Sequence, residues 1–154
     1  MEAVIFIGLQ ATGKSTFYAQ RFMRSHVRIN LDMLHTRRKE AILLDACLNM
    51  PHSFVVDNTN PTREERAGYI RRSRKKGFRI VGYYFSSVVS QALDRNAMRP
   101  ENERVPDAGI RSVHSRLQLP DYSEGFDGLF HVSIASDNSF VVSDWKTENE
   151  VRRS

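Results

Sequence analysis

The sequence predicts an α/β protein built around a mostly parallel β-sheet with helices on both faces. Two observations favour this fold. Short apolar runs typical of buried strands alternate with longer segments whose apolar residues recur at helical spacing. The first of these runs, at residues 3–7, leads directly into a glycine-containing loop and then a helical segment, which is the order that a strand–loop–helix unit requires.

Three apolar runs form the predicted strands of the N-terminal half, at residues 3–7, 26–30 and 53–57. The predicted helices between and after them cover residues 15–24, 32–49 and 60–76. Asp32 is a favourable N-cap for the second of these helices. Asn60 and Pro61 supply a cap and a first-turn proline for the third, which ends in cations before Gly77.

The C-terminal half continues the alternation, with a strand at residues 78–85, helices at 88–98 and 107–117, and a last strand at 129–134. We expect one domain over residues 1–135, with a short helical lid at about residues 95–106. Residues 136–154 form a polar extension, partly docked through Phe140 and Trp145 or mobile.

Composition narrows the class of protein. The chain has 154 residues, one cysteine and a formal net charge of +5, which favours a polyanionic partner but equally fits a solvated basic surface. It has no apolar stretch of membrane-spanning length, and Met1 and Glu2 lead into the first strand without a charged-then-apolar leader. We therefore expect an intracellular protein, cytoplasmic or nuclear, with no membrane contact and no disulfide framework.

The loop after the first strand has the sequence of a phosphate-binding loop, Gly8-Leu9-Gln10-Ala11-Thr12-Gly13-Lys14-Ser15, followed by Thr16. Its glycines allow successive backbone N–H groups to turn inward around a polyphosphate, and the positive end of the next helix faces the same anion. Lys14 can reach the β and γ oxygens, and the Ser15 hydroxyl can ligate the Mg²⁺ that bridges them. The alternative is a tight strand-to-helix turn.

One carboxylate, Asp32, follows the second predicted strand and another, Asp57, ends the third, at the sheet edge where ligands bind in open α/β folds. Asp32 is placed to accept the proton of an acceptor hydroxyl and to aim its oxygen at the γ-phosphate, although it could simply cap a helix. Asp57 is expected to face Mg²⁺, its waters or Ser15, and Asn58 to lie beside the acceptor.

Two basic groups could contact an anionic substrate. His35 should share the helix face of Asp32, with Arg37 and Arg38 close by, where they could hold an acceptor phosphate or form a solvated face. The third helix carries further cations around a narrow apolar stripe of Ala67 and Ile70. These cations are Arg63, Arg66, Arg71, Arg72, Arg74, Lys75 and Lys76, and most of this charge should lie far from the reacting oxygen.

Several motifs resemble those of the kinase domains of phage and mammalian 5′-polynucleotide kinases, in that family's order and over nearly the whole chain. They are the phosphate-binding loop, Asn30 with Asp32, the run Asp57-Asn58-Thr59-Asn60-Pro61, Arg95-Asn96 with Arg99, Val105-Pro106 and Glu124-Gly125-Phe126. The resemblance implies an adenylate-kinase-like core of the P-loop NTPases and transfer of the ATP γ-phosphate to the 5′-hydroxyl of a DNA or RNA end. It implies Asp32 as general base, Lys14 and Ser15 as phosphate and Mg²⁺ contacts, and Asp57 as an acid behind them.

The resemblance also makes Arg95 and Arg99 lid residues, with Arg99 as the transition-state residue. Their spacing predicts that both lie on one helix face just before Pro100, and a Pro- and charge-rich stretch follows. Guanidinium groups over the γ-phosphate would neutralise developing charge. The alternative is an exposed stripe that forms ion pairs with Asp94 or Glu101.

Two departures from the family concern acceptor binding. Family members often carry arginine where this chain has Leu31, and phage members carry arginine where it has His35. A kinase acting on a sugar, nucleoside or antibiotic would share the loop, the aspartate base and the arginine lid, and a nucleotide-dependent switch or ATPase would not need Asp32. Without a fused phosphatase or ligase segment, the chain would act alone or supply one activity to a repair complex.

Overall fold

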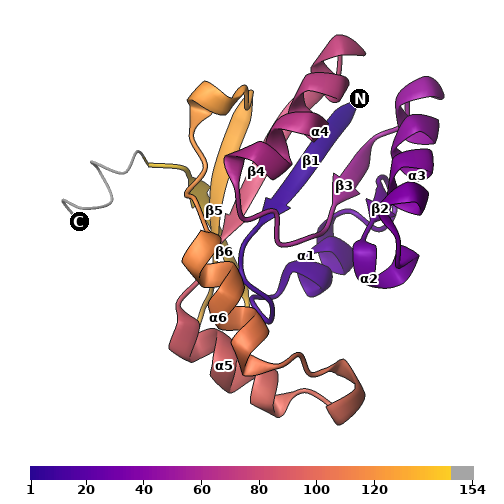
Figure 1. The fold of residues 1–154 in the computed structure, drawn as a ribbon. Coiled ribbons are helices and arrows are strands. Elements are labelled where there is room, and N and C mark those ends of the chain that lie inside the picture. The colour runs from indigo at the N-terminus through magenta and orange to yellow at the C-terminus, as the bar shows by residue number, and fades with distance from the viewer. Residues whose placement is uncertain (147–154) are drawn as a thin grey trace.

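The computed structural model describes residues 1–146, which form one six-stranded sheet in the order β2-β3-β1-β4-β5-β6 (Figure 1). The strands span Glu2–Ile7 (β1), Val27–Ile29 (β2), Phe54–Val56 (β3), Arg79–Phe85 (β4), Gly128–Ile134 (β5) and Phe140–Asp144 (β6). Strands β1 to β5 pair parallel with one another, and β6 pairs antiparallel with β5 at the edge of the sheet. The predicted α/β fold with a mostly parallel sheet is therefore confirmed.

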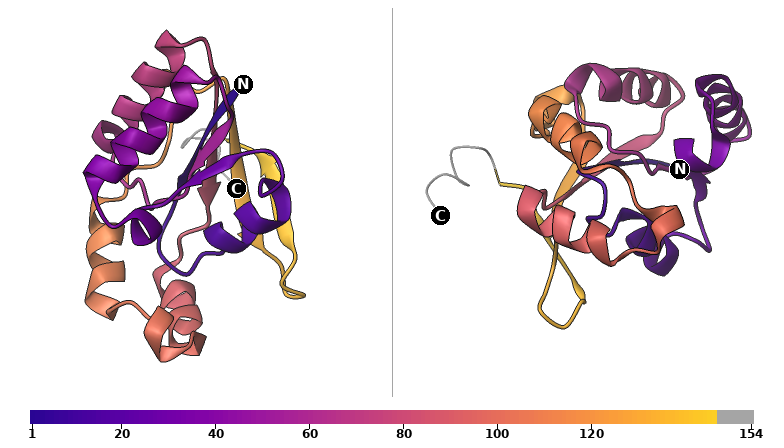
Figure 2. Two further views of the ribbon diagram at one scale, coloured as in Figure 1. Left: turned by 90° about the vertical axis from the view of Figure 1, so that its right-hand side faces the viewer. Right: turned by 60° about the horizontal axis from the view of Figure 1, so that its bottom comes forward.

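Helices cover both faces of this sheet. They span Lys14–Arg21 (α1), Leu31–Leu34 (α2), Arg37–Asn49 (α3), Arg63–Lys75 (α4), Val89–Met98 (α5) and Asp107–Arg116 (α6), with short 3₁₀ turns at Glu101–Glu103 (η1) and Tyr122–Glu124 (η2). Helices α3 and α4 lie on one face and α1 on the other (Figure 2). Helices α5 and α6 pack against each other beyond the carboxyl ends of the strands (Figure 1). Within residues 1–146, no helix is long and apolar enough to cross a membrane.

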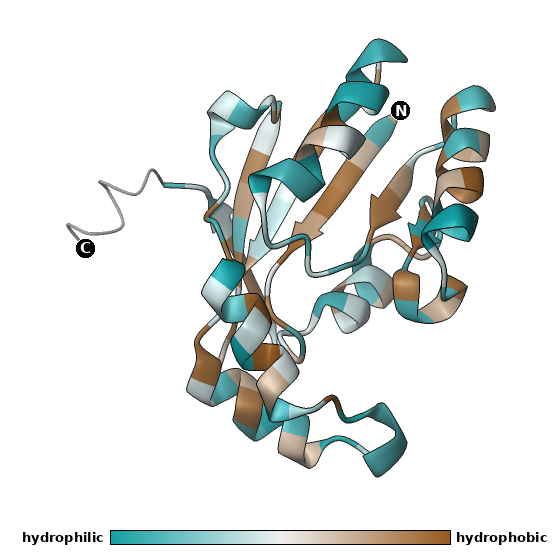
Figure 3. Cartoon of the chain, viewed as in Figure 1, coloured by the Kyte–Doolittle hydropathy of each residue, from teal (hydrophilic) through white to brown (hydrophobic). Residues whose placement is uncertain are grey.

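The centre of the core is β1, which is mostly hydrophobic (Figure 3) and whose residues 3–7 are buried on both faces of the sheet. Ile5 and Ile7 pack in the cluster that includes α3 and α4, whereas Val4 and Phe6 pack with Phe17 of α1. Successive strand residues point to opposite faces, so one apolar run supplies both layers. The loop that follows β1 therefore starts from the most rigid part of the molecule, at the edge where ligands bind in such sheets.

The predicted second helix is wrong in its cap and its continuity. Asn30 caps α2, because its Oδ1 accepts a hydrogen bond from Met33 N at 3.0 Å, and Asp32 lies in the first turn instead. The chain then leaves helical geometry at His35, whose φ is 71°. A new helix, α3, begins after Thr36, whose hydroxyl accepts from Lys39 N. This break separates the backbone around Asp32 from the long helix.

The third predicted helix also begins later than expected. Its N-cap is Thr62, so Pro61 lies before the cap and not in the first turn. Asn60 instead has a φ of 44° and is buried, and its amide donates to the Phe6 carbonyl at 2.8 Å. Asn60 therefore ties the end of β1 to the segment after β3.

The polar C-terminal extension supplies a strand that the sequence analysis missed. Phe140 packs in the core cluster of α1, and a Cβ placed on Gly13 would lie 2.8 Å from Phe140 Cε1. Trp145 packs against the opposite cluster, with its ring centroid 5.2 Å from that of Tyr84. The extension was also predicted to end in a mobile segment, and residues 147–154 lie outside the described residues.

Candidate functional site

The loop between β1 and α1 curls around a small space. Gly8, Ala11 and Gly13 have positive φ values of 152°, 60° and 91°. The loop is pinned by hydrogen bonds from Leu9 N to Ser87 Oγ at 3.1 Å and from Thr12 Oγ1 to Leu9 O at 2.8 Å. Helix α1 begins at the end of this loop, so the positive end of its dipole faces the same space. This arrangement forms a cradle for an anion.

The Lys14 ammonium is buried inside this cradle. Its Nζ donates to the carbonyl oxygen of Gly8 at 3.0 Å and to that of Leu9. Burial lowers the pKa of Lys14 from 10.5 to about 8, an effect that nearby Asp57 opposes. A buried cation whose charge is incompletely compensated favours an anionic ligand beside it.

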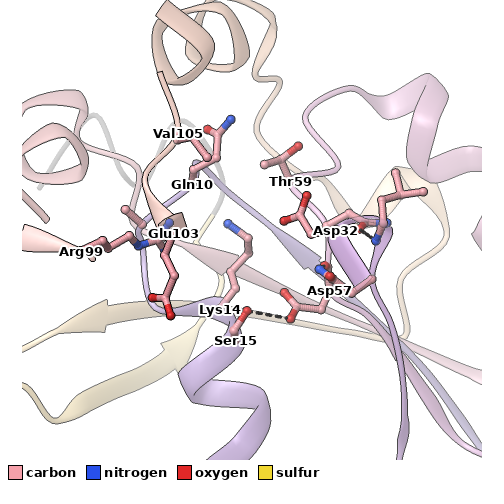
Figure 4. Close-up of a pocket in the computed structure, with 13 residues that line it drawn as sticks. Gln10, Lys14, Ser15, Asp32, Asp57, Thr59, Arg99, Glu103 and Val105 are labelled. Atoms are coloured by element: carbon pink, nitrogen blue, oxygen red, sulfur yellow. Dashed lines mark hydrogen bonds between the residues drawn. The ribbon is translucent and has the colours of Figure 1, made fainter. Parts of the chain in front are cut away.

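A cavity of about 310 Å³ opens in front of the loop. Figure 4 shows the Asp32 carboxylate and the Lys14 ammonium projecting into the same space, with Arg99 entering from the opposite wall. The predicted site residues that line this cavity are Gln10, Ala11, Lys14, Ser15, Asp32, Asp57, Asn58 and Arg99. Thr59 and Val105, which belong to the motifs quoted above but had no predicted role, also line it, as does Glu103. The phosphate-binding loop, the segments around Asp32 and Asp57, and Arg99 thus meet at one cavity.

Ser15 and Asp57 lie together at the floor of the cavity, as expected for a magnesium site. The Ser15 hydroxyl donates to Asp57 Oδ2 at 3.2 Å. Within the described residues, no three His, Cys, Asp or Glu side chains cluster as metal ligands. A hydroxyl with one carboxylate suits Mg²⁺, which keeps several waters and takes its other ligands from phosphates.

Arg28, which was not predicted as a site residue, contacts both members of this pair. Its Nε donates to Asp57 Oδ2 at 2.8 Å and its Nη2 donates to Ser15 Oγ at 2.9 Å. The guanidinium compensates the Asp57 carboxylate, whose side chain is only 2% exposed. A charged residue inside a short apolar strand was the one signal that could have identified it.

The backbone around Asp32 is held by two asparagines. The Asn30 amide donates to the backbone carbonyl of Asp57 at 2.5 Å, and Asn58 Oδ1 accepts from Leu31 N at 2.9 Å. Helix α2 is thereby tied to the segment that follows β3. Asp32 itself is exposed toward the cavity and is anchored through its neighbours.

The other predicted site residues lie outside this cavity or behind its wall. Gly8 and Gly13 shape the loop backbone, and Thr16 is exposed on α1. His35 and Arg38 are exposed at the corner between α2 and α3 and do not line the cavity.

The predicted common helix face of Arg95 and Arg99 is wrong. Arg99 follows α5 in an extended conformation, with φ −70° and ψ 152°, because Pro100 disfavours helical geometry in the residue before it. Arg95 lines a separate small cavity with Thr12 and Gln91.

The predicted apolar stripe of α4 is wrong in part, and several of its cations form ion pairs within the fold. Of the predicted stripe, Ile70 is buried as expected, whereas Ala67 is exposed and Tyr69 is buried in its place. Arg66 is fully buried and forms an ion pair with Glu124 at 2.8 Å. Three more of the predicted cations are paired with acids, in the pairs Arg63–Glu124, Arg72–Asp45 and Arg74–Asp127. Much of this charge therefore stabilises the fold.

Residues 4–120 match a sequence family described as an AAA domain. The chain belongs to this AAA domain family. The domain is 30% identical over 135 residues to a bifunctional polynucleotide phosphatase/kinase from Schizosaccharomyces pombe, a match that covers 85% of this chain. The chain spans 33% of the length of that relative. The predicted likeness to polynucleotide kinases is therefore confirmed.

Solved structures share the fold of this AAA domain. Kti12 from Chaetomium thermophilum in complex with ADP-AlF3 superposes with a TM-score of 0.65, 18% identity and coverage of 98% of this chain and 94% of that one. A gluconokinase from Sinorhizobium meliloti 1021 superposes with a TM-score of 0.61 and 18% identity, covering 88% of this chain and 83% of that one. The predicted P-loop kinase fold is confirmed, and it is a fold shared by kinases of small molecules.

Proposed function

We propose that the chain is an ATP- and Mg²⁺-dependent kinase that transfers the γ-phosphate to the 5′-hydroxyl of a DNA or RNA end. The observation that carries this proposal is the shared cavity of Asp32 and Lys14 (Figure 4). A phosphate cradle alone would serve a switch or an ATPase, whereas transfer to an alcohol needs a carboxylate that faces the cradle. The polynucleotide named for the fission yeast relative supports the choice of acceptor.

The residues fit this nucleotide and metal. The positive-φ loop, the start of α1 and the buried Lys14 would hold the polyphosphate. Ser15 and Asp57 would hold Mg²⁺, Asp57 through water, and the metal would neutralise charge on the β and γ oxygens. Arg95, from the adjacent small cavity, would contact the nucleotide beyond its phosphates.

In this mechanism Asp32 accepts the proton of the 5′-hydroxyl while the oxygen forms its bond to the γ-phosphorus. The bond between that phosphorus and the β–γ bridging oxygen breaks, and ADP leaves. Arg99, on the opposite wall, would offset charge that develops on the transferred group. Asn58 would lie beside the acceptor, and His35 and Arg38 would contact its next phosphate outside the cavity.

To test this proposal, the protein is incubated with Mg²⁺ and ATP labelled in its γ-phosphate, together with 5′-hydroxyl DNA, 5′-hydroxyl RNA, a nucleoside or a sugar. The transfer of label to each acceptor is then measured. We expect label on the oligonucleotides, and a loss of about 10³-fold in the Asp32→Asn variant with ATP affinity unchanged. Asp94→Asn, an exposed acid on α5, is the matched control and should keep full activity. Label only on a sugar or nucleoside would overturn the proposed acceptor, and unchanged transfer by Asp32→Asn would overturn the proposed base.

A further inference from the structure

We propose that Glu40 is a positioning residue for Asp32, because through Asn58 it fixes the one-turn helix that carries this aspartate. The link to catalysis rests on the proposed function, in which Asp32 is the base. The placement of α2 by Glu40 and Asn58 does not depend on the proposed function. The structural claim and the catalytic claim can therefore fail separately.

Glu40 is a buried acid that the proposed mechanism does not use. It lies in the first turn of α3 and is 5% exposed. Its Oε1 accepts from Tyr69 OH at 2.6 Å and from Arg37 Nη1 at 3.1 Å, and its Oε2 accepts from Asn58 Nδ2 at 3.1 Å. Burial of a carboxylate requires donors of this kind, so the side chain is held from three elements.

Asn58 uses both ends of its amide. Its Nδ2 donates to Glu40, and its Oδ1 accepts from the backbone N–H of Leu31 at 2.9 Å. A carboxylate only accepts hydrogen bonds, so it selects the amide orientation that presents nitrogen to Glu40 and oxygen to Leu31. The reverse orientation would place two acceptors together on one side and two donors on the other.

Helix α2 depends on this support. It has four residues, Leu31–Leu34, which is too short for a helix to be stable by itself. The Leu31 amide is one of the N-terminal donors that the helix leaves unsatisfied, and Asp32 is the next residue. A base that must be held to within about 0.5 Å needs such anchoring of its backbone.

The test reverses the polarity of the Glu40–Asn58 hydrogen bond. In Glu40→Gln, the new NH₂ group faces the Asn58 NH₂ group, and in Asn58→Asp two carboxylates face each other. In the double variant Glu40→Gln/Asn58→Asp, the glutamine donates to the aspartate, and the aspartate still presents an oxygen to Leu31. The two donors to the Glu40 Oε1 position, Tyr69 OH and Arg37 Nη1, are also satisfied by the glutamine carbonyl.

The primary measurement is the amide hydrogen exchange of Leu31 by NMR, with Ile5 in β1 as the reference for global stability. We expect exchange at Leu31 to be at least about tenfold faster in each single variant and to return to within about threefold in the double variant. The proposal would be overturned if the Leu31 amide of Glu40→Gln exchanged at a rate within about twofold of that in the unmodified protein. Equal acceleration at Leu31 and Ile5, which would indicate general destabilisation, would also overturn it.

Transfer to 5′-hydroxyl DNA is measured on the unmodified protein and on Glu40→Gln. We expect kcat to fall by at least about tenfold in Glu40→Gln with ATP affinity unchanged. The double variant is judged by Leu31 exchange alone, because Asn58 also lines the proposed acceptor site. If the unmodified protein transfers no phosphate to DNA, the proposed function fails while the Leu31 exchange still decides the positioning role. Unchanged kcat in Glu40→Gln, with faster exchange at Leu31 and an unmodified protein that is active on DNA, would overturn the role of Glu40 in placing the base.

Discussion

Nucleotide affinity should fall with rising pH because Lys14 loses its proton near pH 8. Burial places its pKa at about 8, below the ordinary value of 10.5, and a bound polyphosphate favours the ammonium form and raises this pKa. The protonated fraction is about nine-tenths at pH 7 and about one-tenth at pH 9. If the ammonium form alone binds well, affinity should fall about tenfold between these two pH values.

The assay is isothermal titration of the protein with MgADP at pH 7, 8 and 9, in two buffers of different ionisation enthalpy. At pH 8 we expect an uptake of about half a proton on binding, since half of the Lys14 side chains are neutral before binding. Lys14→Arg is the control, because arginine keeps its charge over this range and should give a flat profile. Constant affinity from pH 7 to 9, or proton release at pH 8, would refute the reasoning.

The same geometry makes three further predictions. Arg99→Ala should lower kcat for 5′-hydroxyl phosphorylation by about 10³-fold with little change in ADP affinity, and a change confined to KM would contradict its transition-state role. Arg28→Met should lower the midpoint of urea unfolding, because it leaves the buried Asp57 carboxylate without its cation, and added Mg²⁺ should restore part of this loss. Equal midpoints of this variant with and without Mg²⁺ would argue against a metal site at Asp57. Glu124→Gln should lower the free energy of unfolding, measured by urea titration, by about 3 kcal/mol, because its partner Arg66 is fully buried. The control Glu65→Gln, which breaks the exposed pair with Arg116, should lower it by less than about 1 kcal/mol.

Much of the fold could be predicted from local patterns. The apolar runs that became β1, β3 and β4 are buried on both sheet faces, so their composition identified them. The break at His35 could not be predicted, because a positive φ at a residue other than glycine has no reliable local signal. Asn30, Asp32 and Thr36 are all good capping residues, and only the folded backbone selects among them.

The candidate site likewise contains residues that could be predicted from the sequence and residues that could not. Lys14, Ser15 and Asp57 belong to motifs whose spacing carries the chemistry, and they meet where the motifs predicted. Arg28 and Glu40 belong to no motif. Their contacts arise because the sheet places β2 beside β3 and because α3 and α4 pack on one face. Such residues become visible only once the strand order is known.

The contact between Phe140 and Gly13 matters for any shortened version of this chain. The family match ends at residue 120, yet the aromatic ring that supports the phosphate-binding loop comes from β6. A recombinant fragment cut at the family boundary would lose β5 and β6, and would leave the edge of β4 and the back of the loop open to water. Fragments made for biochemistry should therefore extend through Trp145, which packs on the opposite face of the sheet.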